Sequence, residues 1–298
     1  MFRRCPRQWY YKNIVASAIA KDQHRRKIYL LGKLQSVSAW RGQIVDRLIS
    51  VVIVNRLRKG QKITLEEAKR LAHEQFSRDL SFARSHNDLK DVNASLHDFV
   101  ALRELYYRES IQDRDLELAL SEIDLALSNL FNMQEIKSVL KEASLLVSQR
   151  TLVFHHCGTS VRAVPDLIVF SNGRAPLIVD WKVHSFGIQE AWLQLAVYAM
   201  ALTRCRPHKD FPSNIKTFEP KDTELVEAQL LTGNTRRYHL EGDEVERAEA
   251  YIAESVDEIE LAIAGRKYQE LSDEDFGVTN FASTCKGCGF REICWSAT

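Results

Sequence analysis

An apolar stretch in the middle of the chain, LIVDWKVHSF at residues 177–186, carries an acid and a lysine two positions apart. Side chains of a strand alternate between the two faces of a sheet, so Asp180 and Lys182 project to one side. Charges this close to a core cost free energy unless they are paired or used. This pair is therefore the first candidate for chemistry.

Asp166 supplies a partner for this pair. It lies fourteen residues before Asp180, in VRAVPDLIVF, which we expect to form the preceding strand of the same sheet. Two neighbouring carboxylates repel each other unless a positive charge lies between them, and Mg²⁺ prefers carboxylate oxygens. The residues predict a divalent-cation site in which Lys182 acts on a bound water. The alternative is a partly buried salt bridge between Asp180 and Lys182, with Asp166 as a turn residue.

A second reactive group consists of cysteines near both chain ends. TCKGCGFREICWS gives the spacing Cys285-x2-Cys288-x5-Cys294, and Cys5 precedes a proline. Cytosolic proteins rarely keep structural disulfides, so this spacing indicates a metal site. Zinc usually takes two close pairs, whereas one distant cysteine and a close triplet suit an iron–sulfur cubane; both stay open from the residues alone. The remaining two cysteines are expected to be small core residues: Cys157 and Cys205.

Composition and charge bound the class of protein. With 45% hydrophobic and 27% charged residues the chain is typical of a globular, soluble protein. Its longest apolar run is too short for a membrane span, and we expect a cytoplasmic protein with no membrane partner. The net charge is only +1, yet residues 1–33 hold nine Lys or Arg and one acid. This basic end indicates a polyanionic partner or a solvated basic helix.

Helical and strand patterns must position these groups. Residues 14–55 have helical periodicity, and a capping box at Thr64 and Glu67 begins a second helical stretch that we expect to reach residue 149. The runs from Thr151 to Val183 predict a three-stranded meander. A helix, two further strands and a long helix follow in these segments: IQEAWLQLAVYAMALTRC, TELVEAQLLTG, TRRYHL and DEVERAEAYIAESVDEIELAIAG.

The charged strand, the Pro-Asp pair before it, and a Gln and a Tyr one helical turn apart after it resemble the nuclease core of the PD-(D/E)XK superfamily, in its RecB-like exonuclease branch. The first motif of that family is Gly-x-x-x-His, and the matching segment here is Gly42 to Asp46, so an aspartate stands where the family has a metal-binding His. An Asp still suits a hard cation. The resemblance implies that Asp46, Asp166 and Asp180 bind Mg²⁺ or Mn²⁺, that Lys182 positions the attacking water, and that Gln194 and Tyr198 support Lys182 and the phosphate.

The cysteines are similar to those of the iron–sulfur nucleases in the same branch, including CRISPR-associated exonucleases and nuclease domains of helicase–nuclease complexes. The resemblance implies a [4Fe-4S] cluster on Cys5, Cys285, Cys288 and Cys294 that joins the chain ends around a restriction-endonuclease-like α/β core, a central mixed sheet flanked by helices, with a helical insert. The implied division is a first cysteine ligand and helical motif (1–55), a helical insert (56–150), the nuclease core (151–270) and a cysteine segment (271–298).

These features together predict a metal-dependent DNA exonuclease that prefers single strands or ends, in DNA repair, recombination or CRISPR-type processing, with helicase or integrase proteins as candidate partners. The alternative is a catalytically silent iron–sulfur scaffold that binds nucleic acid, which Asp46 keeps open; an RNA substrate also stays open. Beside the basic N-terminus, Trp9, Tyr10 and Tyr11 are expected either to guide a strand or to pack around the cluster.

Overall fold

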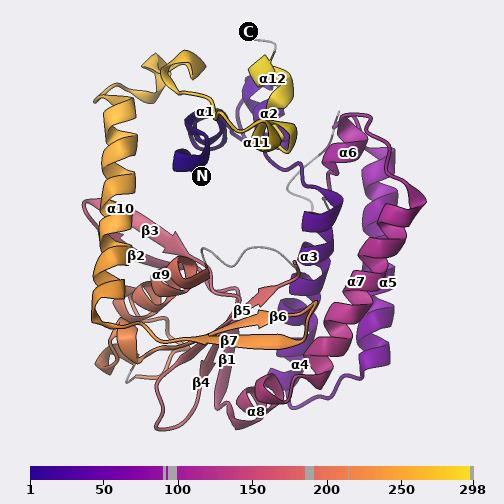
Figure 1. Cartoon of the computed structure of the whole chain (residues 1–298), viewed down its shortest axis with the longest axis vertical. Coiled ribbons are helices and arrows are strands. Elements are labelled where there is room, and N and C mark those ends of the chain that lie inside the picture. The colour runs from indigo at the N-terminus through magenta and orange to yellow at the C-terminus, as the bar shows by residue number, and fades with distance from the viewer. Residues whose placement is uncertain (90–91, 93–98, 185–190, 214, 296–298) are drawn as a thin grey trace. The chain divides into compact units, whose positions relative to one another are not determined.

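The computed structural model describes residues 1–89, 92, 99–184, 191–213 and 215–295 of the chain (Figure 1). The chain divides into two compact units. Unit 1 consists of Met1–Trp40, Phe76–Leu116 and Glu254–Thr298, and unit 2 consists of Arg41–Gln75 and Glu117–Ala253. Each unit has a hydrophobic core of its own.

Unit 2 is built on a five-stranded sheet in the order β1-β4-β5-β6-β7. β5 and β6 are parallel and the other neighbours are antiparallel, so the sheet is mixed and the expected α/β fold is confirmed. A parallel pair needs a crossover connection, which here contains α9 (Ala191–Arg204). The sheet strands are β1 (Leu145–Ser148), β4 (Leu167–Phe170), β5 (Leu177–Lys182), β6 (Glu224–Gln229) and β7 (Asn234–Tyr238), and β2 (Leu152–His156) and β3 (Thr159–Ala163) form a separate hairpin.

Helix α9 provides much of the core of unit 2. It contacts β5 and β6 as well as the β2–β3 hairpin (Figure 1). Leu195 and Ala199 on α9 pack in one cluster with Ile178 on β5 and Leu225 on β6. β4 is buried along its whole length, and β5 is buried up to Trp181, as expected for strands covered on both faces. This packing fixes one face of α9 against the end of β5.

The remaining helices follow the periodicity of the sequence. Within the helical stretch expected at residues 14–55, Ile44, Val45, Leu48 and Ile49 are buried. The Thr64 hydroxyl accepts a hydrogen bond from the backbone N–H of Glu67, as the capping box predicted. The helices are α3 (Val37–Arg47), a π-helical turn (Leu48–Ile53), α4 (Val54–Arg58), α5 (Leu65–Ser85), α7 (Asp113–Asn132), α8 (Gln134–Glu142) and α10 (Gly242–Ile263).

Unit 1 consists of short helices around aromatic and aliphatic side chains. Its core includes Tyr10, Tyr11, Ile28, Phe276 and Phe290. No helix in the described ranges is both long and apolar enough to cross a membrane. The elements are α1 (Pro6–Tyr10), a π-helical turn (Tyr11–Val15), α2 (Gln23–Leu31), α6 (Arg103–Tyr106), α11 (Ala282–Lys286) and α12 (Arg291–Trp295); short 3₁₀ turns of the whole chain lie at Phe2–Arg4, Ile215–Thr217, Pro220–Asp222, Tyr268–Glu270 and Asp273–Asp275.

Two predictions about the strands were wrong. The expected three-stranded meander is two hairpins in different sheets, β2–β3 and β4–β5. Pro165, which has no N–H for a ladder, interrupts the run between β3 and β4. β1 lies in the stretch that we expected to be helical to residue 149, because a short apolar run fits a helix or a strand equally well. Residues 90–91 and 93–98 of that stretch, and 188–190 of the helix after β5, lie outside the described residues.

Candidate active site at the end of strand β5

Asp180 and Lys182 lie on one face of β5, as strand alternation predicted. Their side chains form an ion pair with 2.5 Å between Lys182 Nζ and Asp180 Oδ2, and the Asp180 side chain is only 2% exposed. This contact was part of both interpretations of the sequence, the salt bridge and the cation site. What separates the two interpretations is what else converges on the pair.

Gln194 and Tyr198 on α9 join the pair through hydrogen bonds. Lys182 Nζ donates to Gln194 Oε1 at 2.9 Å. The Gln194 amide nitrogen donates in turn to Asp180 Oδ1 at 3.3 Å and to the Tyr198 hydroxyl at 2.6 Å. Residues four apart on a helix share a face, so both side chains reach the end of β5. The ammonium group of Lys182 is therefore held from two sides.

Asp166 reaches the same place from a loop. We expected it on a strand, but it lies directly before β4, where Pro165 keeps the chain out of the ladder. The backbone N–H of Trp181 donates to Asp166 Oδ2 at 2.9 Å. This bond comes from the residue between Asp180 and Lys182, so it fixes the Asp166 carboxylate beside the charged pair.

Asp46 enters from helix α3. The side chain of Gln149, which follows β1, donates from one amide nitrogen to Asp46 Oδ1 at 3.0 Å and to Asp166 Oδ1 at 3.2 Å. The charges of Asp46 and Asp180 also act on each other. The structure thus brings together all six side chains that the sequence analysis selected at this site: Asp46, Asp166, Asp180, Lys182, Gln194 and Tyr198.

Burial raises the pKa values of all three carboxyl groups, and the charge of at least one neighbouring carboxylate, which is Glu227 in the case of Asp180, adds to each rise. The pKa of Asp166 rises to about 7, first through burial and then through the charges of Asp180 and Asp46. Burial raises the pKa of Asp46 to about 6, although the hydrogen bond from Gln149 opposes the rise. Burial also raises the pKa of Asp180, against the lowering effect of Lys182. Such repulsion is relieved by a proton or by a cation.

The donor set fits a hard divalent cation. Asp180 Oδ2 is buried and accepts no hydrogen bond besides its ion pair with Lys182, and carboxylate oxygens are the ligands that Mg²⁺ and Mn²⁺ prefer. Within the described part of the chain, no three His, Cys, Asp or Glu side chains already lie at the mutual spacing of metal ligands.

Glu227 is a buried charge beside this site that the sequence analysis missed. It lies on β6 directly opposite Asp180 and is fully buried. Arg236 on β7 lies 3.8 Å away, and the side chains of Gln229 and Tyr238 donate to its two carboxylate oxygens. The signal that selected Asp180, an acid inside an apolar strand, is also present in the segment ELVEAQ.

Arg41 is a second residue that the sequence analysis missed. Its guanidinium group is buried on α3, donates to the carbonyl oxygen of Val183 and pairs with Glu122 on α7. Val183 directly follows Lys182, and Asp46 lies five residues after Arg41 on the same helix. Arg41 therefore ties the helix that carries Asp46 to the end of the strand that carries Lys182.

The four selected cysteines lie together in unit 1. Cys5, Cys285, Cys288 and Cys294 line one small cavity. Burial, and then the charges of the other three cysteines, raise the pKa of the Cys288 thiol. The backbone is packed tightly here, because a Cβ on Gly289 would clash with the carbonyl oxygen of Leu31. Among the described residues, these thiols do not lie at the mutual spacing of metal ligands.

The two remaining cysteines differ in burial. Cys205 is buried, as predicted, whereas the prediction that Cys157 is a core residue was wrong. Cys157 is exposed at the turn between β2 and β3, where it adopts a φ of 47° next to Gly158. The chain must turn here within two residues, and this position therefore faces solvent.

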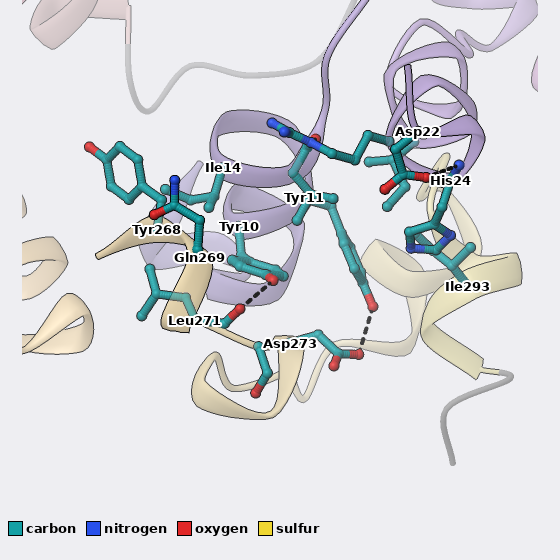
Figure 2. A pocket seen from close by; sticks show the side chains of 14 residues that line it. Tyr10, Tyr11, Ile14, Asp22, His24, Tyr268, Gln269, Leu271, Asp273 and Ile293 are labelled. Carbon is teal, nitrogen blue, oxygen red and sulfur yellow. Dashed lines mark hydrogen bonds between the residues drawn. The ribbon is translucent and has the colours of Figure 1, made fainter. Parts of the chain in front are cut away.

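The aromatic residues of the N-terminus pack inside unit 1. Figure 2 shows a cavity in which the Tyr10 hydroxyl donates to the carbonyl oxygen of Leu271 and the Tyr11 hydroxyl to Asp273, both at 2.9 Å. The Tyr11 ring also lies against that of Phe290, a residue that lies between Cys288 and Cys294 in the sequence. The packing alternative therefore holds for Tyr10 and Tyr11, and these two rings are not a platform for nucleic-acid bases.

Comparison with known proteins gives one extensive match. The family model for the PD-(D/E)XK nuclease superfamily matches residues 1–295. Among solved structures, the chain is similar to a candidate exonuclease from Eubacterium rectale, with 12% identity, a TM-score of 0.37 and coverage of 90% of this chain and 92% of that one. It is also similar to the structure of SSO0001, with 16% identity, a TM-score of 0.29 and coverage of 64% and 77%. No curated protein matches the chain.

Proposed function

Because the chain belongs to the PD-(D/E)XK nuclease superfamily, we propose that it is a metal-dependent deoxyribonuclease that acts as an exonuclease on single strands or DNA ends. One observation carries this proposal. Asp46 on α3 and Asp166 in the loop before β4 share the amide of Gln149, and Asp166 also binds the backbone of β5 between Asp180 and Lys182, where Lys182 pairs with Asp180 and donates to Gln194. A salt bridge alone needs neither Asp46 nor Asp166.

In this proposal Asp46, Asp166 and Asp180 hold one or two Mg²⁺ or Mn²⁺ ions. When bound, such a cation supplies a Lewis acid that stabilises negative charge on the scissile phosphate. The raised pKa values of Asp46 and Asp166 fit this role, because the repulsion among the carboxylates disappears when a cation shares them.

Lys182 positions the attacking water in this proposal. Its ammonium group has three N–H donors, and Gln194 and Asp180 accept two of them. The third is left to point at a water or at a phosphate oxygen. The water oxygen forms a bond to phosphorus and gives one proton to solvent, while the ester bond to the leaving sugar oxygen breaks and that oxygen takes a proton from solvent. Tyr198 supports Lys182 indirectly, through Gln194. Its hydroxyl accepts from the same Gln194 amide that contacts Asp180.

The cysteines of unit 1 support the second part of the proposal, a [4Fe-4S] cluster on Cys5, Cys285, Cys288 and Cys294. Four thiols around one cavity suit thiolate-bound iron, and mutual repulsion in their charged forms is relieved by a bound metal. Zinc would satisfy the same thiols. Iron and zinc content measured on the purified protein separates the two metals.

The silent-scaffold alternative stays a prediction from the sequence, and the place of Asp46 supports the catalytic proposal over it. It rested on Asp46 in place of the family's His, and Asp46 lies in the same hydrogen-bonded group as Asp166. The helicase or integrase partners, the repair, recombination or CRISPR-type pathway and the cytoplasmic location stay predictions from the sequence. Release of nucleotides from end-labelled DNA with Mn²⁺, and its loss with a chelator, tests the proposed activity.

A further inference from the structure

Gln149 contacts two of the three carboxylates although it belongs to no motif that the sequence analysis selected. One amide nitrogen donates to Asp46 Oδ1 at 3.0 Å and to Asp166 Oδ1 at 3.2 Å. An amide NH₂ group carries partial positive charge and has two N–H donors. It therefore lies between two like charges and satisfies an oxygen of each.

The backbone of Gln149 is shaped for this contact. Its φ is 50°, in the left-handed region that residues with a Cβ seldom adopt. Its backbone N–H donates to the carbonyl oxygen of Asp166 at 3.2 Å, so main chain and side chain both bind that residue. The side chain is otherwise exposed and fills no core. Gln149 thus combines an unfavourable φ with hydrogen bonds to two carboxylates, and this combination indicates a functional position.

We propose that Gln149 is a positioning residue whose amide takes the place of the divalent cation between Asp46 and Asp166 while the site is empty, and that cation binding displaces it. This inference rests on the proposed cation site. It explains why the carboxylates stay close together despite their repulsion, yet are not at metal-ligand spacing in the described residues. The exposure of Gln149 leaves its side chain room to turn toward solvent.

The proposal predicts in which direction the affinity for the cation changes when the Gln149 amide is removed. In this proposal a cation bound between Asp46 and Asp166 occupies the place of the Gln149 amide, so both hydrogen bonds break on binding. Removing the two donors should therefore destabilise the cation-free protein and raise the apparent affinity for the cation. If Gln149 were instead a ligand through its Oε1 atom, removing it would lower the affinity.

Two variants separate these roles, and both keep an unbranched or γ-branched side chain at a residue with positive φ. Gln149→Leu removes the donors, and we expect it to lower the melting temperature in chelator by about 2–4 °C and to tighten Mn²⁺ binding about tenfold by calorimetry. Gln149→Lys puts a tethered ammonium group between the carboxylates. It should melt at or above the wild-type temperature in chelator and should show no Mn²⁺ binding heat.

The matched control is Gln134→Lys, which adds the same charge at the exposed first residue of α8. It should leave the melting temperature and the Mn²⁺ titration of the wild type unchanged. Weaker Mn²⁺ binding by Gln149→Leu, or wild-type binding by Gln149→Lys, would overturn the proposal for Gln149. If the wild-type protein itself bound no Mn²⁺, the proposed cation site would fail instead, and the two failures are thus distinguishable.

Discussion

The two units position their reactive groups by different means. In unit 2, side chains from two helices, a strand and a loop are already linked by hydrogen bonds at the end of β5. In unit 1, the cysteines lie in or beside α1, α11 and α12, which have only five residues each. Helices this short are not stable by themselves. The comparison teaches that hydrogen bonds between the sheet and its neighbouring elements hold the first group of side chains together, whereas short helices carry the second.

A large loss of activity is expected in unit 2 for Lys182→Ala. Removing the ammonium group leaves the strand and the carboxylates in place, so kcat should fall at least about a hundredfold while Mn²⁺ still binds. Single-turnover cleavage and calorimetry on one preparation check both parts. Lys221→Ala is the matched control, because Lys221 also follows an acid by two residues but lies exposed on the surface; it should keep full activity. Equal loss in both variants would contradict the role of Lys182.

The comparison predicts the opposite outcome in unit 1, where a substitution should cost stability. Cys5→Ser should remove broad absorbance near about 400 nm and most bound iron, and lower the melting temperature by about 5 °C or more, because metal binding at such a site contributes to folding. Cys205→Ser is the control, since that thiol is buried elsewhere, in the core of unit 2. If Cys5→Ser kept its full absorbance, Cys5 would not be a ligand of the cluster. If the wild-type protein contained stoichiometric zinc and no iron, the metal at these thiols would be zinc.

Asp46 tests how much of the site depends on helix α3. Asp46→Asn removes a charged ligand and should raise the Mg²⁺ concentration for half-maximal rate about tenfold. Asp46→His should stay active and shift its preference toward Mn²⁺, because imidazole suits softer ions. Rate measurements across a metal titration decide this. Identical metal dependence of the wild type and both variants would place Asp46 outside the site.

The smallest expected effect is a pH dependence of stability. The folded-state pKa values of Asp46 and Asp166, about 6 and about 7, lie above the ordinary value of 3.8. Raised carboxyl pKa values stabilise the fold at low pH, and this contribution is lost as pH rises through 6 and 7. The cation-free protein should therefore melt a few degrees lower at pH 8 than at pH 5.5. Added Mn²⁺ should stabilise more at pH 8, because protons no longer compete.

A variant sharpens the pH experiment. Asp166→Asn removes the carboxyl with the larger shift and should flatten the melting profile of the cation-free protein between pH 5.5 and 8. A profile as steep as that of the wild type would assign the pH dependence to other groups.

Four of the site residues have a local period in the sequence, whereas Asp46 was predicted from the resemblance to a family motif and Asp166 from its place before the charged strand. Asp180 and Lys182 share a face because strand side chains alternate, and Gln194 and Tyr198 share one because they are four apart on a helix. Gln149 had no such signal, since a three-dimensional contact alone places it beside Asp46. The separation of the β2–β3 hairpin from the central sheet was missed for a similar reason, because apolar runs do not reveal which strands pair.

The central claim is that the carboxylate group at the end of β5 cleaves DNA with a divalent cation. The most direct test incubates purified wild-type protein and the Asp180→Ala variant with end-labelled single-stranded and double-stranded DNA, with Mn²⁺ or with chelator, after melting curves confirm that both are folded. The account predicts shortening of the DNA by the wild type with Mn²⁺, faster on single strands or from ends, and none with chelator or with Asp180→Ala. Equal cleavage by Asp180→Ala, or no cleavage of any DNA by folded wild-type protein with Mn²⁺, would contradict it.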